Sequence, residues 1–375
     1  MKLYEYQTKE LFQQVGIPTP KGKVIGSASD LESAKVDLPL PRVIKSQVRK
    51  GGRGKAGLIQ FASTEEETKE AVHHLFRHPE KISKLLLEER LDIKKEMFLS
   101  ITIDPKTSSP LIMACAEGGM EIEEIANLFP GKIVQERVDI FRGLGNFQAR
   151  DVMCRLGLQG QQITHGAQIL VQLYRLFRSF DAELLEINPL VMTREGTLVA
   201  ADAKMNIDDN ALFRQKRFVK SRDQFDDDLE FEAFQEGLHY IRFEGDIGVM
   251  SAGAGLTMTI MDLIKHFGGH PANFLEFGGA AYGRAAKAMN IALKNPEVKV
   301  ILITTFGLIA RADVIAQGIA QAIRELKPKI PIVAAVRGTG EEEAFKILED
   351  IGIESMRDTE EAVKKAVVIA AGRAS

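Results

Sequence analysis

Hydrophobic and polar positions alternate regularly in the last third of the chain. Short apolar runs there are each followed by a stretch with apolar residues at helical spacing. The expected order is strand 246–250, helix 256–267, strand 272–276, helix 281–294, strand 298–305, helix 311–326, strand 331–336, helix 341–351, strand 353–355 and helix 358–372. Such alternation predicts a parallel sheet with helices on both faces. Ligands bind these sheets where the strands end, so we expect a site among the turns 251–255, 277–280, 306–310 and 337–340.

The first 235 residues mix helices and strands with less regularity. The pattern predicts helix 2–15, strand 42–47, helix 64–76, strands 85–88 and 96–103, helix 163–180 and a hairpin over 183–204. A charged stretch follows at 216–228 and is the best candidate for a connection between domains, with a solvated helix face as the alternative. We therefore predict two domains, 1–230 and 236–375.

Composition narrows the functional classes. Of the 375 residues, 45% are hydrophobic and 27% charged, which is typical of a soluble globular protein. A net charge of −3 and the absence of Trp argue against a general nucleic-acid binder. Cys115 and Cys154 are the only cysteines, so neither a zinc site nor a disulfide framework is expected. No apolar run approaches the ~20 residues of a membrane span, and we expect a cytoplasmic protein with reduced thiols.

A glycine-rich basic loop is the strongest local signal. The stretch VIKSQVRKGGRGKAG, residues 43–57, places Lys45 on a strand and Gly52, Arg53, Gly54 and Lys55 in the loop. Glycines let backbone N–H groups fold around phosphate oxygens, and the basic side chains add positive charge. The spacing differs from that of a Walker A loop. A flexible basic surface loop is the alternative interpretation. Downstream, Glu88 ends an apolar strand, where a carboxylate can accept hydrogen bonds from ribose hydroxyls; a plain surface glutamate is the alternative interpretation.

The stretch ELLEINPLVMTREGTLVAADAKM, residues 183–205, predicts a hairpin that turns at Arg194-Glu195-Gly196. Paired positions then sum to 390, so Asn188 lies opposite Asp202 and Glu186 opposite Lys204, all on one face. Leu185, Ile187 and Ala201 occupy the other face and are expected in the core. Carboxylate and amide oxygens suit Mg²⁺ held between protein and nucleotide phosphates. An exposed polar face is the alternative.

Together these stretches resemble the β subunit of succinate–CoA ligase, an ATP-grasp enzyme. The matching segments are YEYQTKELFQQVGIPTP, KGGRGKAG, AEGGMEIEEIA, LLEINPLV, NALFR, GHPANFLEFGG and RADVIAQGI. The resemblance implies an α/β chain: an α+β ATP-grasp domain followed by a doubly wound, flavodoxin-like CoA-ligase domain. It implies the reaction of a small carboxylic acid, CoA and ATP or GTP to acyl-CoA, nucleoside diphosphate and phosphate. It also implies Mg²⁺ and a partner α subunit that binds CoA and carries the phosphorylated histidine.

The resemblance further assigns roles to single residues. Glu186 would steady the partner's histidine during phosphoryl transfer, and Asn188 and Asp202 would hold Mg²⁺. The implied nucleotide-binding residues are Lys45, Gly52, Arg53, Gly54, Glu88, Leu91 and Glu96. The implied acid-binding residues are Ser251, Leu308, Ile309 and Ala310.

The chain departs from the family pattern at the acid-binding turns. Ser251 stands where the family usually has Asn, Leu308 replaces a glycine, and Ala312 replaces a cysteine. Arg337 adds a guanidinium near the next turn, a group suited to a carboxylate. We expect the phosphate chemistry to be kept, with succinate as the default acid and malate or citrate as alternatives. A non-catalytic nucleotide-binding regulatory subunit and an unrelated single-chain ATP-grasp ligase are the competing interpretations.

Overall fold

The chain forms two compact units in the computed structural model, Met1–Lys220 and Ser221–Ser375. The division falls within the charged stretch 216–228. Helices and mixed sheets confirm the predicted α/β class. The structure describes residues 1–31, 38–49, 52–120, 122–128, 131–277, 285–307 and 311–372. Within these ranges, no helix combines the length and apolarity needed to cross a membrane.

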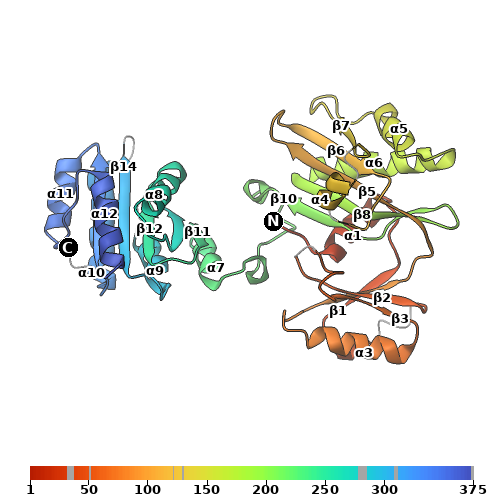
Figure 1. The fold of residues 1–375 in the computed structure, drawn as a ribbon, viewed down its shortest axis with the longest axis horizontal. Coiled ribbons are helices and arrows are strands. Elements are labelled where there is room, and N and C mark those ends of the chain that lie inside the picture. Colours follow the sequence, from red (N-terminus) through yellow and green to blue (C-terminus); the bar gives the residue numbers. More distant parts are fainter. Residues whose placement is uncertain are drawn as a thin grey trace. The chain divides into compact units, whose positions relative to one another are not determined.

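A four-stranded antiparallel sheet forms the smaller lobe of the first unit (Figure 1). In spatial order its strands are β1 (Gly22–Ile25), β4 (Leu85–Glu89), β2 (Arg42–Ser46) and β3 (Ile59–Ala62). Helix α3 (Glu65–Phe76) covers this sheet, and Thr64 caps it by accepting a hydrogen bond from the N–H of Glu67. A short 3₁₀ turn, η1 (Ala28–Asp30), follows β1. The lobe therefore has a small core of its own between α3 and the sheet.

The larger lobe of the first unit is built on a second sheet. Its strands are, in spatial order, β10 (Lys204–Ile207), β8 (Ala182–Thr193), β5 (Ile93–Asp104), β6 (Ser109–Cys115) and β7 (Val134–Arg137), while β9 (Leu198–Ala200) pairs with β8. Its helices are α4 (Ile122–Leu128), α5 (Asn146–Arg155), α6 (Gln161–Ser179) and the 3₁₀ turn η2 (Asp209–Ala211). Apolar residues of α5 and α6 pack with those of β5 and β8 in one core.

The first residues of the chain join the two lobes. Helix α1 (Glu5–Gln14) buries Leu11 and Phe12 in the core of the larger lobe. The N–H of Leu3 donates to the carbonyl oxygen of Met205 on β10 at 2.9 Å. The N–H of Tyr6 donates to Gln47, just after β2, at 3.1 Å. Helix α1 is thereby fixed to both sheets, and its first turn lies between them.

The second unit holds a five-stranded sheet. In spatial order its strands are β11 (His239–Arg242), β13 (Asn273–Glu276), β12 (Ile247–Ser251), β14 (Val300–Gly307) and β15 (Ile332–Gly338). The last four are parallel, and their order is that of flavodoxin-like sheets, as predicted. The expectation of an all-parallel sheet is wrong, because β11 pairs antiparallel with β13. The returning strand covers an edge that would otherwise expose unpaired backbone groups.

Helices cover both faces of this sheet, as the alternating pattern predicted. Along β14, Ile301 and Ile303 point into one core, and Val300 and Leu302 into the other. The first core includes α7 (Asp228–Gln235), α9 (Ala285–Lys294), α10 (Ala312–Leu326) and α11 (Glu341–Glu349). The second includes α8 (Ala254–His266) and α12 (Thr359–Ala370). A 3₁₀ turn, η3 (Arg222–Gln224), precedes α7. The predicted strand 353–355 is reduced to one bridge between Ser355 and Ala334.

Candidate functional site

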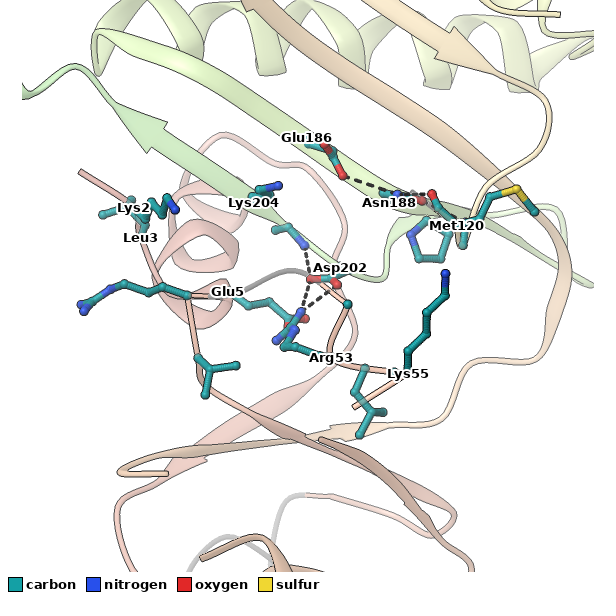
Figure 2. A pocket seen from close by; sticks show the side chains of 18 of the residues that line it. Lys2, Leu3, Glu5, Arg53, Lys55, Met120, Glu186, Asn188, Asp202 and Lys204 are labelled. Carbon is teal, nitrogen blue, oxygen red and sulfur yellow. Dashed lines mark hydrogen bonds and ion pairs between the residues drawn. The ribbon is translucent and has the colours of Figure 1, made fainter. Parts of the chain in front are cut away.

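A cavity of about 270 Å³ lies in the first unit, between the glycine-rich loop, the start of α1 and the face of β8 (Figure 2). Among the described residues, five cationic side chains and three carboxylates line it. They are Lys2, Arg49, Arg53, Lys55, Lys204, Glu5, Glu186 and Asp202. The excess of positive charge suits a polyphosphate. The loop residues Gly52 and Gly54 also line this cavity, and Gly52 has a φ of +71°, which favours glycine.

The hairpin has the predicted register. Glu186 pairs with Lys204 and Leu190 with Ala200, so paired positions sum to 390 on both sides of the gap between β9 and β10. The turn closes through Gly196, whose N–H donates to the carbonyl oxygen of Thr193 at 2.9 Å. Leu185 and Ile187 are fully buried, as expected, whereas Ala201 is half-buried rather than in the core. Glu186 and Asn188 of β8 therefore face the same cavity as Asp202.

Arg53 lies between two carboxylates. Its Nη1 donates to Oε2 of Glu5 at 2.6 Å, and its Nη2 donates to both carboxylate oxygens of Asp202 at 2.7 Å. Figure 2 shows the guanidinium between these two side chains. Burial alone would lower the pKa of Arg53, but the carboxylates of Asp202 and Glu5 raise that pKa above its usual value. The guanidinium therefore neutralises Asp202 in this structure.

A cluster of four buried charges, Glu5, Lys9, Lys45 and Glu88, lies beside the cavity; we call it the ion cluster. Nζ of Lys45 lies 2.9 Å from Glu5 and 2.8 Å from Glu88, and Nζ of Lys9 lies 2.7 Å and 2.5 Å from the same two carboxylates. Both ammonium groups also donate to the carbonyl oxygen of Ala201 at 2.7 Å. Two cations and two anions thus balance inside the protein, as buried charges must.

The contacts of the ion cluster favour the charged forms of Glu5 and Lys45. Burial alone would raise the pKa of Glu5, but Lys45, Lys9 and Arg53 hold the pKa of that carboxyl well below its usual range. Burial alone would lower the pKa of Lys45, but Glu5 and Glu88 raise it. The sequence reasoning identified Lys45 and missed Glu5 and Lys9. Their one signal was the placement of charge at i and i+4 on the face of α1 that is buried.

Of the predicted nucleotide residues, Gly52, Arg53 and Gly54 line this cavity, whereas Lys45, Glu88, Leu91 and Glu96 lie outside its described lining. Glu88 is 2% exposed and faces Lys9 and Lys45. Leu91 is half-buried beyond the end of β4. Glu96 is half-buried on β5, close to Gly119, where an added Cβ would lie 2.7 Å from its Oε2. The structure therefore brings Lys45 and Arg53 together with the hairpin residues, and Glu88 joins them only through the ion cluster.

Asn188 holds the loop that contains Gly119 and Met120. Its Oδ1 accepts a hydrogen bond from the N–H of Gly119 at 2.9 Å, and its Nδ2 donates to the carbonyl oxygen of Met120 at 2.9 Å. Nδ2 also lies 3.4 Å from Oε1 of Glu186. The described residues contain no group of three His, Cys, Asp or Glu side chains able to hold a metal ion. The oxygens of Asn188 and Asp202 nevertheless fit Mg²⁺, which is bound through few protein ligands when phosphates and water supply the rest.

The carboxyl end of the second sheet differs in character. Ser251 is fully buried at the end of β12, and its Oγ lies 2.6 Å from Oγ1 of Thr304 on β14. Arg337 donates to Glu341 at 2.9 Å. Gly338 has a φ of +116°, and an added Cβ would lie 1.9 Å from the carbonyl oxygen of Gly307. The predicted acid-binding residues Leu308, Ile309 and Ala310 lie outside the described residues.

Comparisons with known proteins agree with this two-part architecture. Residues 2–192 match the ATP-grasp domain family and residues 250–369 match the CoA-ligase family. These matches fall within the predicted domains 1–230 and 236–375. An ATP citrate lyase structure from Methanothrix soehngenii has a TM-score of 0.77 at 21% identity, covering 99% of both chains, which shows the fold alone.

Curated relatives extend over the whole chain. A subunit of ADP-forming sulfoacetate–CoA ligase from Bilophila wadsworthia is 50% identical and covers 100% of both chains. A sulfoacetate–CoA ligase subunit from Acholeplasma is 47% identical over 99% of this chain and 92% of the relative. The β subunit of an ADP-forming succinate–CoA ligase from Ignicoccus hospitalis is 43% identical over 99% of both chains. This chain therefore belongs to the β-subunit family of ADP-forming acid–CoA ligases, which joins an ATP-grasp domain to a CoA-ligase domain.

Proposed function

We propose that this chain is the nucleotide-binding subunit of an ADP-forming acid–CoA ligase whose acid is sulfoacetate. The observation that carries the choice of acid is the 50% and 47% identity, over nearly full lengths, to two subunits named for sulfoacetate. The reaction joins the acid and CoA to acyl-CoA while ATP is converted to ADP and phosphate. A partner α subunit supplies the CoA site and the histidine that carries the phosphoryl group. Succinate is the competing acid, favoured by the 43% identity to a succinate–CoA ligase subunit.

The departures in the second unit support a changed acid. Sulfoacetate and succinate are both short dianions, but a sulfonate carries three oxygens on a tetrahedral sulfur, whereas a carboxylate is planar with two. Ser251 and Leu308 stand at turns where the family pattern has Asn and Gly. The Ser251 hydroxyl is directed at Thr304 within the sheet, so it offers the acid less than an Asn amide does. A differently shaped anion is consistent with these exchanges.

The first unit supports the retained phosphate chemistry. Lys45 and Arg53 are the proposed phosphate ligands, and Asn188 and Asp202 the proposed holders of Mg²⁺. When bound with the nucleotide, Mg²⁺ offsets negative charge on its phosphates. Because Nη2 of Arg53 donates to both oxygens of Asp202, this contact would have to open for Asp202 to hold Mg²⁺, whereas Nη1 can keep its contact with Glu5. Glu186, half-buried on the same face, accepts the N–H of the partner's imidazole and leaves its other nitrogen as the nucleophile.

The test is a substrate panel with the chain assembled with its α subunit. ADP and acyl-CoA are measured with sulfoacetate, succinate, malate and citrate, each with ATP and with GTP. We expect kcat/KM for sulfoacetate to exceed that for succinate by about tenfold or more, the size of discrimination that a shaped pocket gives. A preference for succinate contradicts the proposed acid. Absence of ADP formation with every acid, although MgATP binds, favours the regulatory subunit instead.

A further inference from the structure

We infer that Glu5 is a positioning residue of the nucleotide site, holding Lys45 and Arg53 in the geometry in which they meet the nucleotide phosphates. The inference rests on the proposed function, because it takes these two cations as phosphate ligands. Glu5 belongs to the first turn of α1, and 40 residues separate it from Lys45 along the chain. Its carboxylate lines the cavity although only 4% of the residue is exposed.

The two carboxylate oxygens of Glu5 serve different cations. Oε1 lies 2.9 Å from Nζ of Lys45 and 2.7 Å from Nζ of Lys9, while Oε2 accepts from Nη1 of Arg53 at 2.6 Å. One side chain therefore fixes the distance between the strand lysine and the loop arginine. Within the described site, Glu88 contacts Lys45 and Asp202 contacts Arg53, but only Glu5 contacts both cations.

The position of Glu5 is itself fixed. Lys9, one turn later on α1, contacts both Glu5 and Glu88, and α1 is anchored by buried Leu11 and Phe12. Long Lys and Arg side chains lose rotamer entropy when they are ordered. Cations that are ordered before the ligand arrives do not incur that loss on binding. Glu5 therefore acts on nucleotide affinity through the conformations of Lys45 and Arg53.

Glu5 could act on the nucleotide through its charge or through positioning, and the two roles predict opposite changes in nucleotide affinity when Glu5 is replaced by Gln. A carboxylate in the wall of a phosphate site repels phosphate, so Glu5→Gln should tighten nucleotide binding if only charge matters. If Glu5 positions the two cations, Glu5→Gln weakens binding, because Lys45 is then held by Glu88 and Arg53 by Asp202, and no carboxylate joins the two cations. A merely structural role lowers thermal stability and leaves the affinity of the folded protein unchanged.

The experiment is calorimetric titration of the full chain with MgATP. We expect Glu5→Gln to weaken binding by about tenfold or more, the range for hydrogen bonds to charged groups. Glu10→Gln is the matched control, because Glu10 is exposed on the same helix and lies 3.9 Å from its nearest cation, Arg217. In an Arg53→Met background the effect of Glu5→Gln should shrink, since the two changes act through one contact. Unchanged or tighter binding by folded Glu5→Gln, or full additivity with Arg53→Met, overturns the inference.

Glu5→Asp decides the question if Glu5→Gln does not fold. It keeps the charge but is one methylene shorter, so it cannot reach Lys45 and Arg53 together. Positioning predicts weaker MgATP binding by this variant, and binding equal to wild type contradicts it. The wild-type titration separates this inference from the proposed function. If the wild-type protein fails to bind MgATP, the proposed function fails. If the wild-type protein binds MgATP and the Glu5 variants bind it equally well, only the role of Glu5 is rejected.

Discussion

The two units place polar groups in opposite ways. In the first unit, charge is brought inside: Glu5 and Glu88 contact Lys9 and Lys45, and Arg53 extends the contacts to the hairpin. In the second unit, the end of the sheet is shaped by backbone and by a buried hydroxyl pair between β12 and β14. The charged pairs there, such as the one formed by Arg311 with Asp313, are partly exposed.

This difference bears on how each site can change. Each buried charge of the first unit depends on several others, so one substitution affects them all. A hydroxyl pair or a half-exposed ion pair can be exchanged with little loss of folding free energy. The departures from the family pattern cluster in the second unit, although Arg49 and Lys50 beside the first unit's glycine-rich loop also depart from it.

The largest effect is expected from Glu186→Gln. This variant tests the phosphoryl-transfer step while leaving the ion cluster intact. Glu186 is half-buried and lies outside the cluster, so the variant should fold and bind MgATP as wild type does. Phosphoryl transfer to the partner's histidine should fall by about 10²–10⁴-fold, the usual loss for a group that handles a proton in catalysis. The measurement is nucleotide-dependent labelling of the α subunit. Glu183→Gln, exposed on the same strand, is the control. Undiminished labelling contradicts the role of Glu186.

Lys45→Met tests the dependence of the first unit on its buried charges. Removing the ammonium leaves Glu5 and Glu88 short of a partner, which should cost about 3–5 kcal/mol of unfolding free energy. Hydrogen exchange read by mass spectrometry reports the two units separately. Loss of protection should be confined to 1–220, and exposed Lys69→Met should show none. A loss of unfolding free energy below 1 kcal/mol would mean that the ion cluster rearranges easily. The first unit would then depend on its buried charges no more than the second unit depends on its exposed ones.

Gly338→Ala tests the backbone shape of the second unit. An alanine at this positive φ would press its Cβ against the carbonyl of Gly307, so β14 and β15 must separate. The expected loss is roughly 3 kcal/mol, a typical upper value for backbone strain, and it should appear in the second unit alone. Gly255→Ala is the control, because nothing lies within 4 Å of its added Cβ. Equal stability of the two alanine variants would show that side chains, and not the backbone conformation of Gly338, determine how β14 and β15 approach each other.

The smallest effect is expected from Ser251→Ala. Removing the Oγ leaves the Thr304 hydroxyl without this contact, at a cost of about 1 kcal/mol. Thermal unfolding should change by a few degrees, and kcat/KM for the acid should change less than tenfold. Thr259→Ala, which removes an exposed hydroxyl on α8, is the comparison. A large loss of acid-dependent turnover at unchanged stability would instead make Ser251 a ligand of the acid.

The sequence was most informative where a short period fixes the geometry. The register of the hairpin followed from one turn and a period of two, because a slip by one residue would bury Glu186 and expose Leu185. The strands and helices after residue 240 followed from the same kind of pattern. Short strands without a clear period, such as β1 and β7, were missed, and so was the antiparallel edge strand β11.

The ion cluster was beyond sequence reasoning. Glu5 and Lys9 look like surface charges on an amphipathic helix, and only the packing of α1 against both sheets buries them. Glu88 was expected at a ribose because it ends an apolar strand, yet in the structure it faces Lys9 and Lys45. Pairing of this kind depends on contacts between residues far apart in the chain, which no local pattern encodes.

The attachment of α1 to β10 has a consequence for biosynthesis. Leu3 is bonded to Met205, and the ammonium groups of Lys9 and Lys45 meet at the carbonyl of Ala201. At roughly 5–20 residues per second, a ribosome needs roughly ten to forty seconds to extend the chain across that separation. During this interval the chain before α1 lacks its partner strand β10, and Lys9 and Lys45 lack the carbonyl of Ala201. The nucleotide site can thus close only after β10 has been synthesised, when its earliest and latest parts first coexist.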